Sequence, residues 1–146
     1  MSRSTEAPFS RSWVGLADVD RALLVLGALS AFAAVGLGAF GAHALSSRLT
    51  PERAVTFETG VRYQLVHALG LFVVVFLRTI GPDAVSESVA GLLFVAGMVL
   101  FSGSLYVLAL TGIRRWGIVT PFGGICLLIG WLALGWAAAT VTFRFA

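Results

Sequence analysis

The sequence contains no lysine, a single cysteine and few charged residues of any kind. All ten basic residues are arginines, and charged residues make up only 12% of the 146, about half the share that is usual in a soluble domain. The lone Cys126 excludes an internal disulfide and a metal site built from cysteines. The net charge of +3 is small and the arginines form no single strip, so we expect no nucleic-acid partner.

Apolar length is what the sequence has in abundance. Hydrophobic residues make up 58% of the chain and fall into four long stretches separated by short charged islands. A helix needs about 20 apolar residues to cross the hydrocarbon core of a bilayer. We therefore predict an all-α, four-helix, up-down transmembrane bundle over residues 21–146, after a flexible tail at residues 1–20. The expected spans are residues 23–45, 62–80, 88–111 and 121–143.

Two Thr-Pro pairs mark predicted helix starts. Thr50 and Pro51 are followed by Glu52, a combination of N-cap, first-turn proline and first-turn acid that favours a helix N-terminus. We expect a short amphipathic helix from there toward Gly60, before the second span. Thr120-Pro121 repeats the signal and predicts the start of the fourth span there.

The connections between the spans are short, so neighbouring helices should run antiparallel. Four spans then place both termini on one side of the membrane, here called side A, and the loops at 46–62 and 112–119 on the other, side B. Each side carries five arginines, so the positive-inside rule assigns no orientation.

Small residues predict close contacts between helices. Ser30, Ala34, Gly38 and Ala42 recur every four residues along the first span, with Gly41 beside them, and such stripes let membrane helices approach one another. Further packing positions are expected at Gly103, Pro121, Gly123 and Gly124.

The polar side chains of the spans gather toward side B, and the side-A halves are apolar. Because polar groups in hydrocarbon need partners, and antiparallel helices bring these residues to one depth, we predict one connected cluster beneath the side-B head groups. Its members are His43, Tyr63, Gln64, His67, Ser102, Ser104, Tyr106 and Thr120.

Several roles are open for this cluster. It is either purely structural or a non-enzymatic pocket for a partner protein, a second copy of the chain, a lipid head group or a small solute. Two alternatives are a haem- or metal-binding redox protein that uses His43 and His67, and a small-solute transporter. No metal or cofactor is otherwise expected.

The positions of the acids disfavour other chemistry. All seven acids fall outside the predicted spans, whereas a proton-coupled exporter usually buries a carboxylate. A hydrolytic triad would likewise lack its orienting acid, so we do not expect an enzyme.

Four ordered motifs carry a family resemblance. GAFGAHAL at 38–45, YQLVHALGL at 63–71, FSGSLYVLAL at 101–110 and TPFGGICLLIGW at 120–131 resemble a family of small bacterial membrane proteins, the domain-of-unknown-function family numbered 423. The family has distant relatives among small eukaryotic transmembrane proteins. The resemblance covers about residues 21–143 and implies a four-helix protein of the bacterial cytoplasmic membrane. It brings no activity with it, and its motif residues largely coincide with the side-B cluster.

Overall fold

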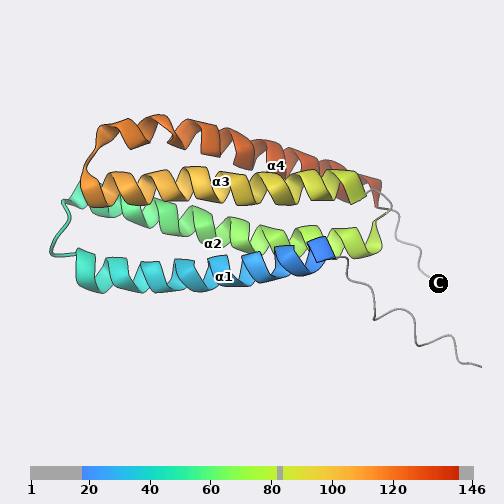
Figure 1. Ribbon diagram of the computed structural model, residues 1–146, viewed down its shortest axis with the longest axis horizontal. Helices are drawn as coiled ribbons and strands as arrows, with labels where there is room; N and C mark the ends of the chain where they lie inside the picture. The colour runs from blue at the N-terminus through green and yellow to red at the C-terminus, as the bar shows by residue number, and fades with distance from the viewer. Residues whose placement is uncertain (1–17, 82–83, 142–146) are drawn as a thin grey trace, which may run out of the picture.

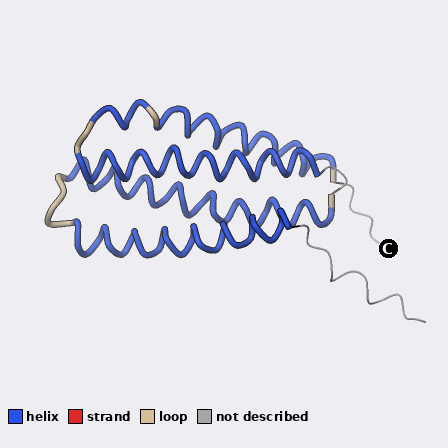
Figure 2. Tube along the Cα trace, viewed as in Figure 1, coloured by secondary structure: helices blue, strands red, loops and turns tan. Residues whose placement is uncertain are grey.

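The computed structural model describes residues 18–81 and 84–141, which form four long helices (Figure 1). In chain order these are α1 (Asp18–Phe40), which continues into the π-helical turn η1 (Gly41–Leu45), then α2 (Pro51–Ile80), α3 (Ala84–Thr111) and, after the short 3-10 helix η2 (Arg114–Ile118), α4 (Thr120–Thr140). Helices and short connections account for all of the described chain (Figure 2). The predicted up-down four-helix fold is confirmed.

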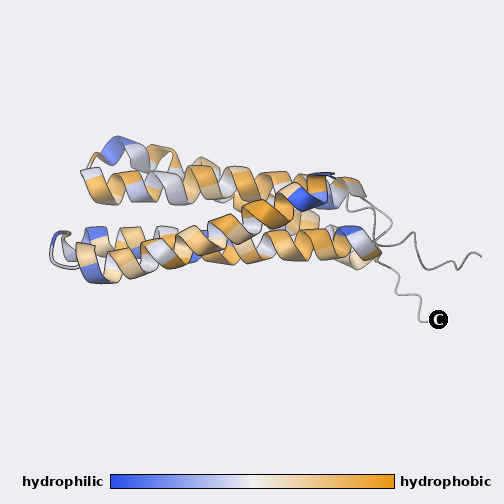
Figure 3. Cartoon of the chain, turned by 60° about the horizontal axis from the view of Figure 1, so that its bottom comes forward, coloured by the Kyte–Doolittle hydropathy of each residue, from blue (hydrophilic) through white to orange (hydrophobic). Residues whose placement is uncertain are grey.

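The helices are long and apolar enough to cross a membrane, each covering 27 to 30 residues when η1 and η2 are counted with their neighbours. At 1.5 Å per residue they are about 40–45 Å long, so they exceed a hydrocarbon core of about 30 Å. Figure 3 shows hydrophobic residues along the helices and the strongly hydrophilic ones mainly toward the two ends of the bundle. The excess length therefore extends into the head-group regions.

Both Thr-Pro pairs stand at helix starts, but only the first threonine caps its helix. Thr50 caps α2 as predicted, since its Oγ1 accepts the backbone N–H of Arg53 at 3.4 Å and Pro51 follows at the first position. At α4 the expected threonine cap is wrong. Val119 is the residue before the helix and has no polar side chain with which to cap it, while Thr120 is already helical and its hydroxyl bonds to Ser104.

The helix boundaries also differ from the expected spans. Residues 18–20, expected in the tail, already belong to α1, and residues 51–80 form one continuous helix in place of a short helix followed by a span. Residues 84–87 precede the expected third span but are helical. Residues 1–17 of the predicted tail lie outside the described part. Apolar content marks where a helix meets hydrocarbon, not where its backbone hydrogen bonds begin.

The helices pack in sequence order, α1 on α2, α2 on α3 and α3 on α4, whereas α2 and α4 touch only weakly. The main core joins all four helices, with Leu23 from α1, and includes the fully buried Leu71, Val74 and Phe94. Because α2 and α4 both pack on α3 and hardly touch each other, a groove remains between them.

Glycines make the closest helix contacts. A Cβ on Gly123 would lie 2.3 Å from the backbone nitrogen of Phe101, so α4 approaches the α3 backbone directly at this point. Near Gly124, by contrast, the Phe101 ring carbons would lie 3.7 Å away, an ordinary contact. Gly103 has nothing within 4 Å and makes no close approach among the described residues. Pro121 is exposed at the start of α4.

The small-residue stripe of α1 lies mostly against α2. Ala34 is fully buried, and Cβ atoms on Gly38 and Gly41 would meet Val61 at 3.3 Å and Phe57 at 3.0 Å. Ala42, at the end of the stripe, is exposed.

Candidate functional site

The side-B polar residues form three separate hydrogen-bonded groups, not the single network that we predicted. The first group joins α1, α2 and α3. The Gln64 amide donates to the carbonyl oxygen of Ser30 at 2.9 Å, and the Tyr106 hydroxyl donates to Gln64 Oε1 at 2.8 Å. The Tyr106 ring packs on Phe57 with centroids 5.0 Å apart. Both ends of the Gln64 amide are thus engaged in holding helices together.

The second group joins α2 to α4 through His67, which is 3% exposed. The Trp131 indole donates to His67 Nε2 at 3.0 Å, and His67 Nδ1 lies 2.7 Å from the carbonyl oxygen of Tyr63. An indole N–H is only a donor and a carbonyl only an acceptor, so Nε2 must be the accepting nitrogen and Nδ1 must carry the hydrogen. Both nitrogens of this neutral imidazole are therefore engaged.

Aromatic rings surround that imidazole. Phe94 and Trp131 pack edge-on against it, with centroids at 5.3 Å and 5.9 Å, and the half-exposed Tyr63 ring stacks at 6.0 Å. Tyr63 also contacts Phe101, with centroids 4.6 Å apart. The surroundings are apolar, so the hydrogen bond from Trp131 is the main polar link between α2 and α4.

The third group joins α3 to α4. Ser104 Oγ lies 2.8 Å from Thr120 Oγ1 and donates to the carbonyl oxygen of Phe101 at 2.9 Å. Because the Ser104 hydroxyl has a single hydrogen and donates it to that carbonyl, the Thr120 hydroxyl is the donor in the bond between the two side chains. Ser102 is also buried, but no described residue forms a hydrogen bond with its hydroxyl.

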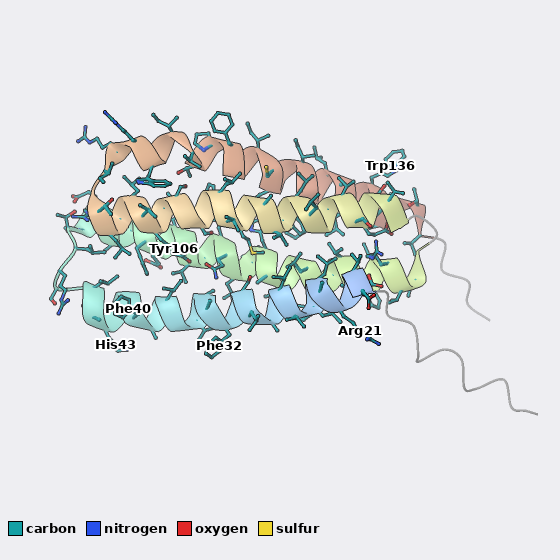
Figure 4. All side chains as sticks on the ribbon, viewed as in Figure 1. Arg21, Phe32, Phe40, His43, Tyr106 and Trp136 are labelled. Atoms are coloured by element: carbon teal, nitrogen blue, oxygen red, sulfur yellow. The ribbon has the colours of Figure 1, made fainter. Side chains whose placement is uncertain are left out.

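His43 lies apart from all three groups, which corrects the prediction of a shared two-histidine site. It belongs to η1, is exposed, and extends from the face of α1 that points away from the bundle (Figure 4). His67 is buried between α2 and α4 with both ring nitrogens hydrogen-bonded. One metal or haem iron cannot reach both imidazoles in this arrangement. Residues 18–81 and 84–141 also hold no group of three or more His, Cys, Asp or Glu side chains that could bind a metal.

A pocket of about 560 Å³ lies between α2 and α4, and we call it the α2–α4 groove. It is lined by Arg62, Tyr63, Val66, His67, Phe101, Gly124, Leu127, Leu128 and Trp131. His67 and Leu127 are buried at its base, whereas Val66 and Leu128 are exposed at its edges. The groove is therefore apolar, opens sideways into the membrane, and has a guanidinium at its side-B end.

A second pocket, the α1–α2 groove, has a volume of about 530 Å³ and lies on the other flank of α2. Its lining includes Leu45, Ser46, Phe57, Glu58, Val61 and again Arg62. Arg62 thus borders both grooves.

Buried charges at side A are the residues that the sequence interpretation missed. Arg78 Nε donates to Asp20 Oδ1 at 2.5 Å, with both side chains about 11% exposed, and the same guanidinium bonds to Ser88. Glu87 is 1% exposed, and within the described part of the chain neither of its carboxylate oxygens has a hydrogen-bond partner. The prediction placed all acids outside the four spans and did not foresee this burial, because α1 and α3 begin before their apolar stretches and bring Asp20 and Glu87 into the bundle.

Four long apolar helices, a polar side-B half tied together by hydrogen bonds, and an apolar groove open to the bilayer define a multi-pass integral membrane protein. Comparison with known proteins agrees with this class. The family model described as "Protein of unknown function (DUF423)" matches residues 37–124, and the chain belongs to this family of bacterial membrane proteins.

Similar proteins cover nearly the whole of the helical region. The UPF0382 membrane protein YwdK of Bacillus subtilis is 47% identical over 118 residues, which are 81% of this chain and 96% of that protein. A UPF0382 membrane protein of Staphylococcus epidermidis is 44% identical over 123 residues, 84% of this chain and 98% of that protein. No solved structure matches the chain.

Proposed function

We propose that this protein, as a non-enzymatic component of the bacterial cytoplasmic membrane, binds a membrane lipid in the α2–α4 groove. The groove itself is the observation that carries the proposal. Its volume of about 560 Å³ falls within the range of about 300–1,000 Å³ that is typical of small-molecule sites, and its walls are apolar along the depth where acyl chains lie.

The open side of the groove favours a lipid over a water-soluble solute. Val66 and Leu128 at its edges are exposed, and in a bilayer such edges face acyl chains. A ligand that enters from the bilayer needs no aqueous path. Inside the groove its acyl chain would make apolar contacts like those that it leaves in the bilayer. The base also offers a polar solute no free nitrogen of His67, because both ring nitrogens are already engaged.

Arg62 gives the groove a polar end. It borders the groove at side B and is exposed, so an arginine stands where a lipid head group meets its chains. Guanidinium groups bind phosphate through two parallel hydrogen bonds. An acyl chain against Leu127 and Leu128, with its phosphate at Arg62, matches the order of apolar and charged groups along the groove.

Filling the groove tests this proposal. Gly124 lines the groove, and a Cβ there makes only ordinary contact with Phe101, so Gly124→Leu should occupy the space of a chain without forcing α3 and α4 apart. Gly135 is on the same helix with nothing within 4 Å, so Gly135→Leu is the matched control. The protein is purified in mild detergent, and retained lipid is measured by native mass spectrometry.

We expect the wild type and Gly135→Leu to retain lipid and Gly124→Leu to lose it. A second pair guards against misfolding: Leu128→Trp narrows the groove, and Leu132→Trp, at a more exposed position of α4 outside the groove, does not. Equal retention in all four variants would refute a lipid site in this groove.

One observation supports a second candidate, a proton-coupled transporter of small solutes. Glu87 is a buried carboxylate that finds no hydrogen-bond partner among residues 18–81 and 84–141, and intramembrane carboxylates commonly mark ion or proton pathways. In proteoliposomes that contain a pH-sensitive dye, this role requires proton flux in the wild type that Glu87→Gln removes. Equal flux in both proteins, or none, excludes it.

A further inference from the structure

We propose that the lipid in the α2–α4 groove is recognised by a zwitterionic head group that carries both a phosphate and a primary ammonium, as in phosphoethanolamine lipids. The inference rests on the proposed lipid site and deepens it by naming the ligand chemistry. Arg62 is the phosphate partner and Glu58 the ammonium partner.

The position of Arg62 on α2 carries the first step. Successive helical residues turn by about 100°, so Tyr63 and Val66 lie to one flank of Arg62 and Glu58 and Val61 to the other. The first two line the α2–α4 groove and the second two line the α1–α2 groove, while Arg62 lines both. A head group held at Arg62 therefore has a chain-sized apolar space on one flank and a space that contains Glu58 on the other.

The depth of this pair along the membrane normal fits a head group. Arg62 precedes the buried Arg78–Asp20 pair by 16 residues of α2, about 24 Å of helix. With Arg78 near the side-A edge of a hydrocarbon core of about 30 Å, Arg62 and Glu58 lie near the side-B edge. The arginine side chain also points toward the helix N-terminus, which is toward the side-B head groups.

The two side chains are paired but weakly held. Arg62 and Glu58 make a 2.7 Å ion pair one helical turn apart, with side chains 70% and 65% exposed. Exposed pairs of this kind contribute little to stability, so both groups remain available to a ligand. Neither forms any other hydrogen bond or ion pair within residues 18–81 and 84–141.

Charge complementarity then selects the head group. A head group with a phosphate and no positive group would be attracted to Arg62 but would be repelled by the Glu58 carboxylate. A phosphate followed by an ammonium meets an opposite charge at both positions, and the primary ammonium also donates hydrogen bonds to the carboxylate. A quaternary ammonium keeps the charge but has no N–H, so a phosphocholine lipid should bind less well.

The test compares three lipids with identical acyl chains and phosphoethanolamine, phosphoglycerol or phosphocholine head groups. Each lipid is titrated into purified, delipidated full-length protein, and bound lipid is counted by native mass spectrometry. We expect the wild type to prefer phosphoethanolamine lipid. Glu58→Gln should reduce its preference over phosphoglycerol lipid by about threefold, and Arg62→Gln should weaken both by about tenfold. Glu52→Gln and Arg48→Gln, exposed changes at side B outside both grooves, should change neither.

The outcomes separate the inference from the proposal beneath it. If the wild type binds no lipid, or if Gly124→Leu binds as much lipid as the wild type, the lipid site itself is wrong. If Gly124→Leu prevents binding but the wild type prefers phosphoglycerol lipid, shows no preference, or keeps its preference in Glu58→Gln, the lipid site stands and the head-group assignment is overturned.

Discussion

Replacing Gly123 by alanine should loosen the contact between α3 and α4. The added Cβ would lie 2.3 Å from the backbone nitrogen of Phe101 and 2.8 Å from its Cα, whereas heavy atoms pack best at about 3.5–4.0 Å. Because these are backbone atoms, no rotamer change relieves the overlap and α4 must shift by about 1 Å. Overpacking costs about 1–3 kcal/mol, and the helix propensity of alanine returns about 1 kcal/mol. We expect the free energy of unfolding to fall by about 1 kcal/mol.

Alanine at Gly124 and Gly135 provides the comparison on the same helix. A Cβ on Gly124 would lie 3.7 Å from the Phe101 ring, and one on Gly135 has nothing within 4 Å, so both should gain from propensity alone. Unfolding in mixed micelles, titrated with a denaturing detergent and followed by circular dichroism, ranks the three variants. If Gly123→Ala is as stable as Gly124→Ala, the close approach of α4 to the α3 backbone is refuted.

Two further predictions concern the polar links between helices. Trp131→Phe leaves His67 Nε2 without its donor and should lower the free energy of unfolding by about 1–2 kcal/mol. The control Trp136→Phe, at an exposed site, should change the free energy of unfolding little. Equal effects of the two substitutions would show that the indole hydrogen bond contributes nothing. Arg78→Gln leaves Asp20 without the positive charge that it meets in the native protein. It should lower the free energy of unfolding, measured in the same micelle titration, by about 3–5 kcal/mol. A loss below about 1 kcal/mol would mean that water or lipid head groups reach the pair.

The fold was predictable because hydropathy and turn chemistry both act locally. An apolar stretch long enough to cross hydrocarbon has to be helical, and short connections between four such stretches leave an up-down bundle as the simple arrangement. The cap at Thr50 followed for the same reason, since its partner, the N–H of Arg53, is only three residues away. At Thr120 the expected cap does not form, because the threonine hydroxyl bonds to the hydroxyl of Ser104 on another helix.

The arrangement of the site was less predictable because depth in a membrane does not specify direction around a helix axis. His43 and His67 were expected to meet because both lie toward side B. The π-helical turn Gly41–Leu45 changes the residue-to-residue rotation at the end of α1, and His43 faces outward. The role of Trp131 was missed for a related reason. An indole in a span reads as an apolar residue, although its N–H needs an acceptor when buried.

The side-A charges show a different limit of hydropathy. Asp20 and Glu87 fall just outside the apolar stretches, so Asp20 was assigned to the tail and Glu87 was placed before the third span. Helix continues through both positions, and neighbouring helices then bury them. A charged residue within one turn of a predicted span is therefore better treated as part of the helix, with a search for its partner on a neighbouring span, as Arg78 is for Asp20.

The hydrogen bonds of the described residues also bear on the proposed position of the lipid head group. Inside the side-B half, Gln64, Tyr106, His67 and Ser104 are all engaged in bonds between helices, so a ligand that used them would have to break the contacts that hold the bundle together. Arg62 and Glu58 are different, because in the part of the chain that the structure describes their side chains form only an exposed ion pair of small net value. Recognition at the rim of the groove costs the fold little, whereas recognition in its interior would cost the fold its helix contacts. For this reason we place the polar end of the ligand at Arg62 and only its chain against the His67–Trp131 pair.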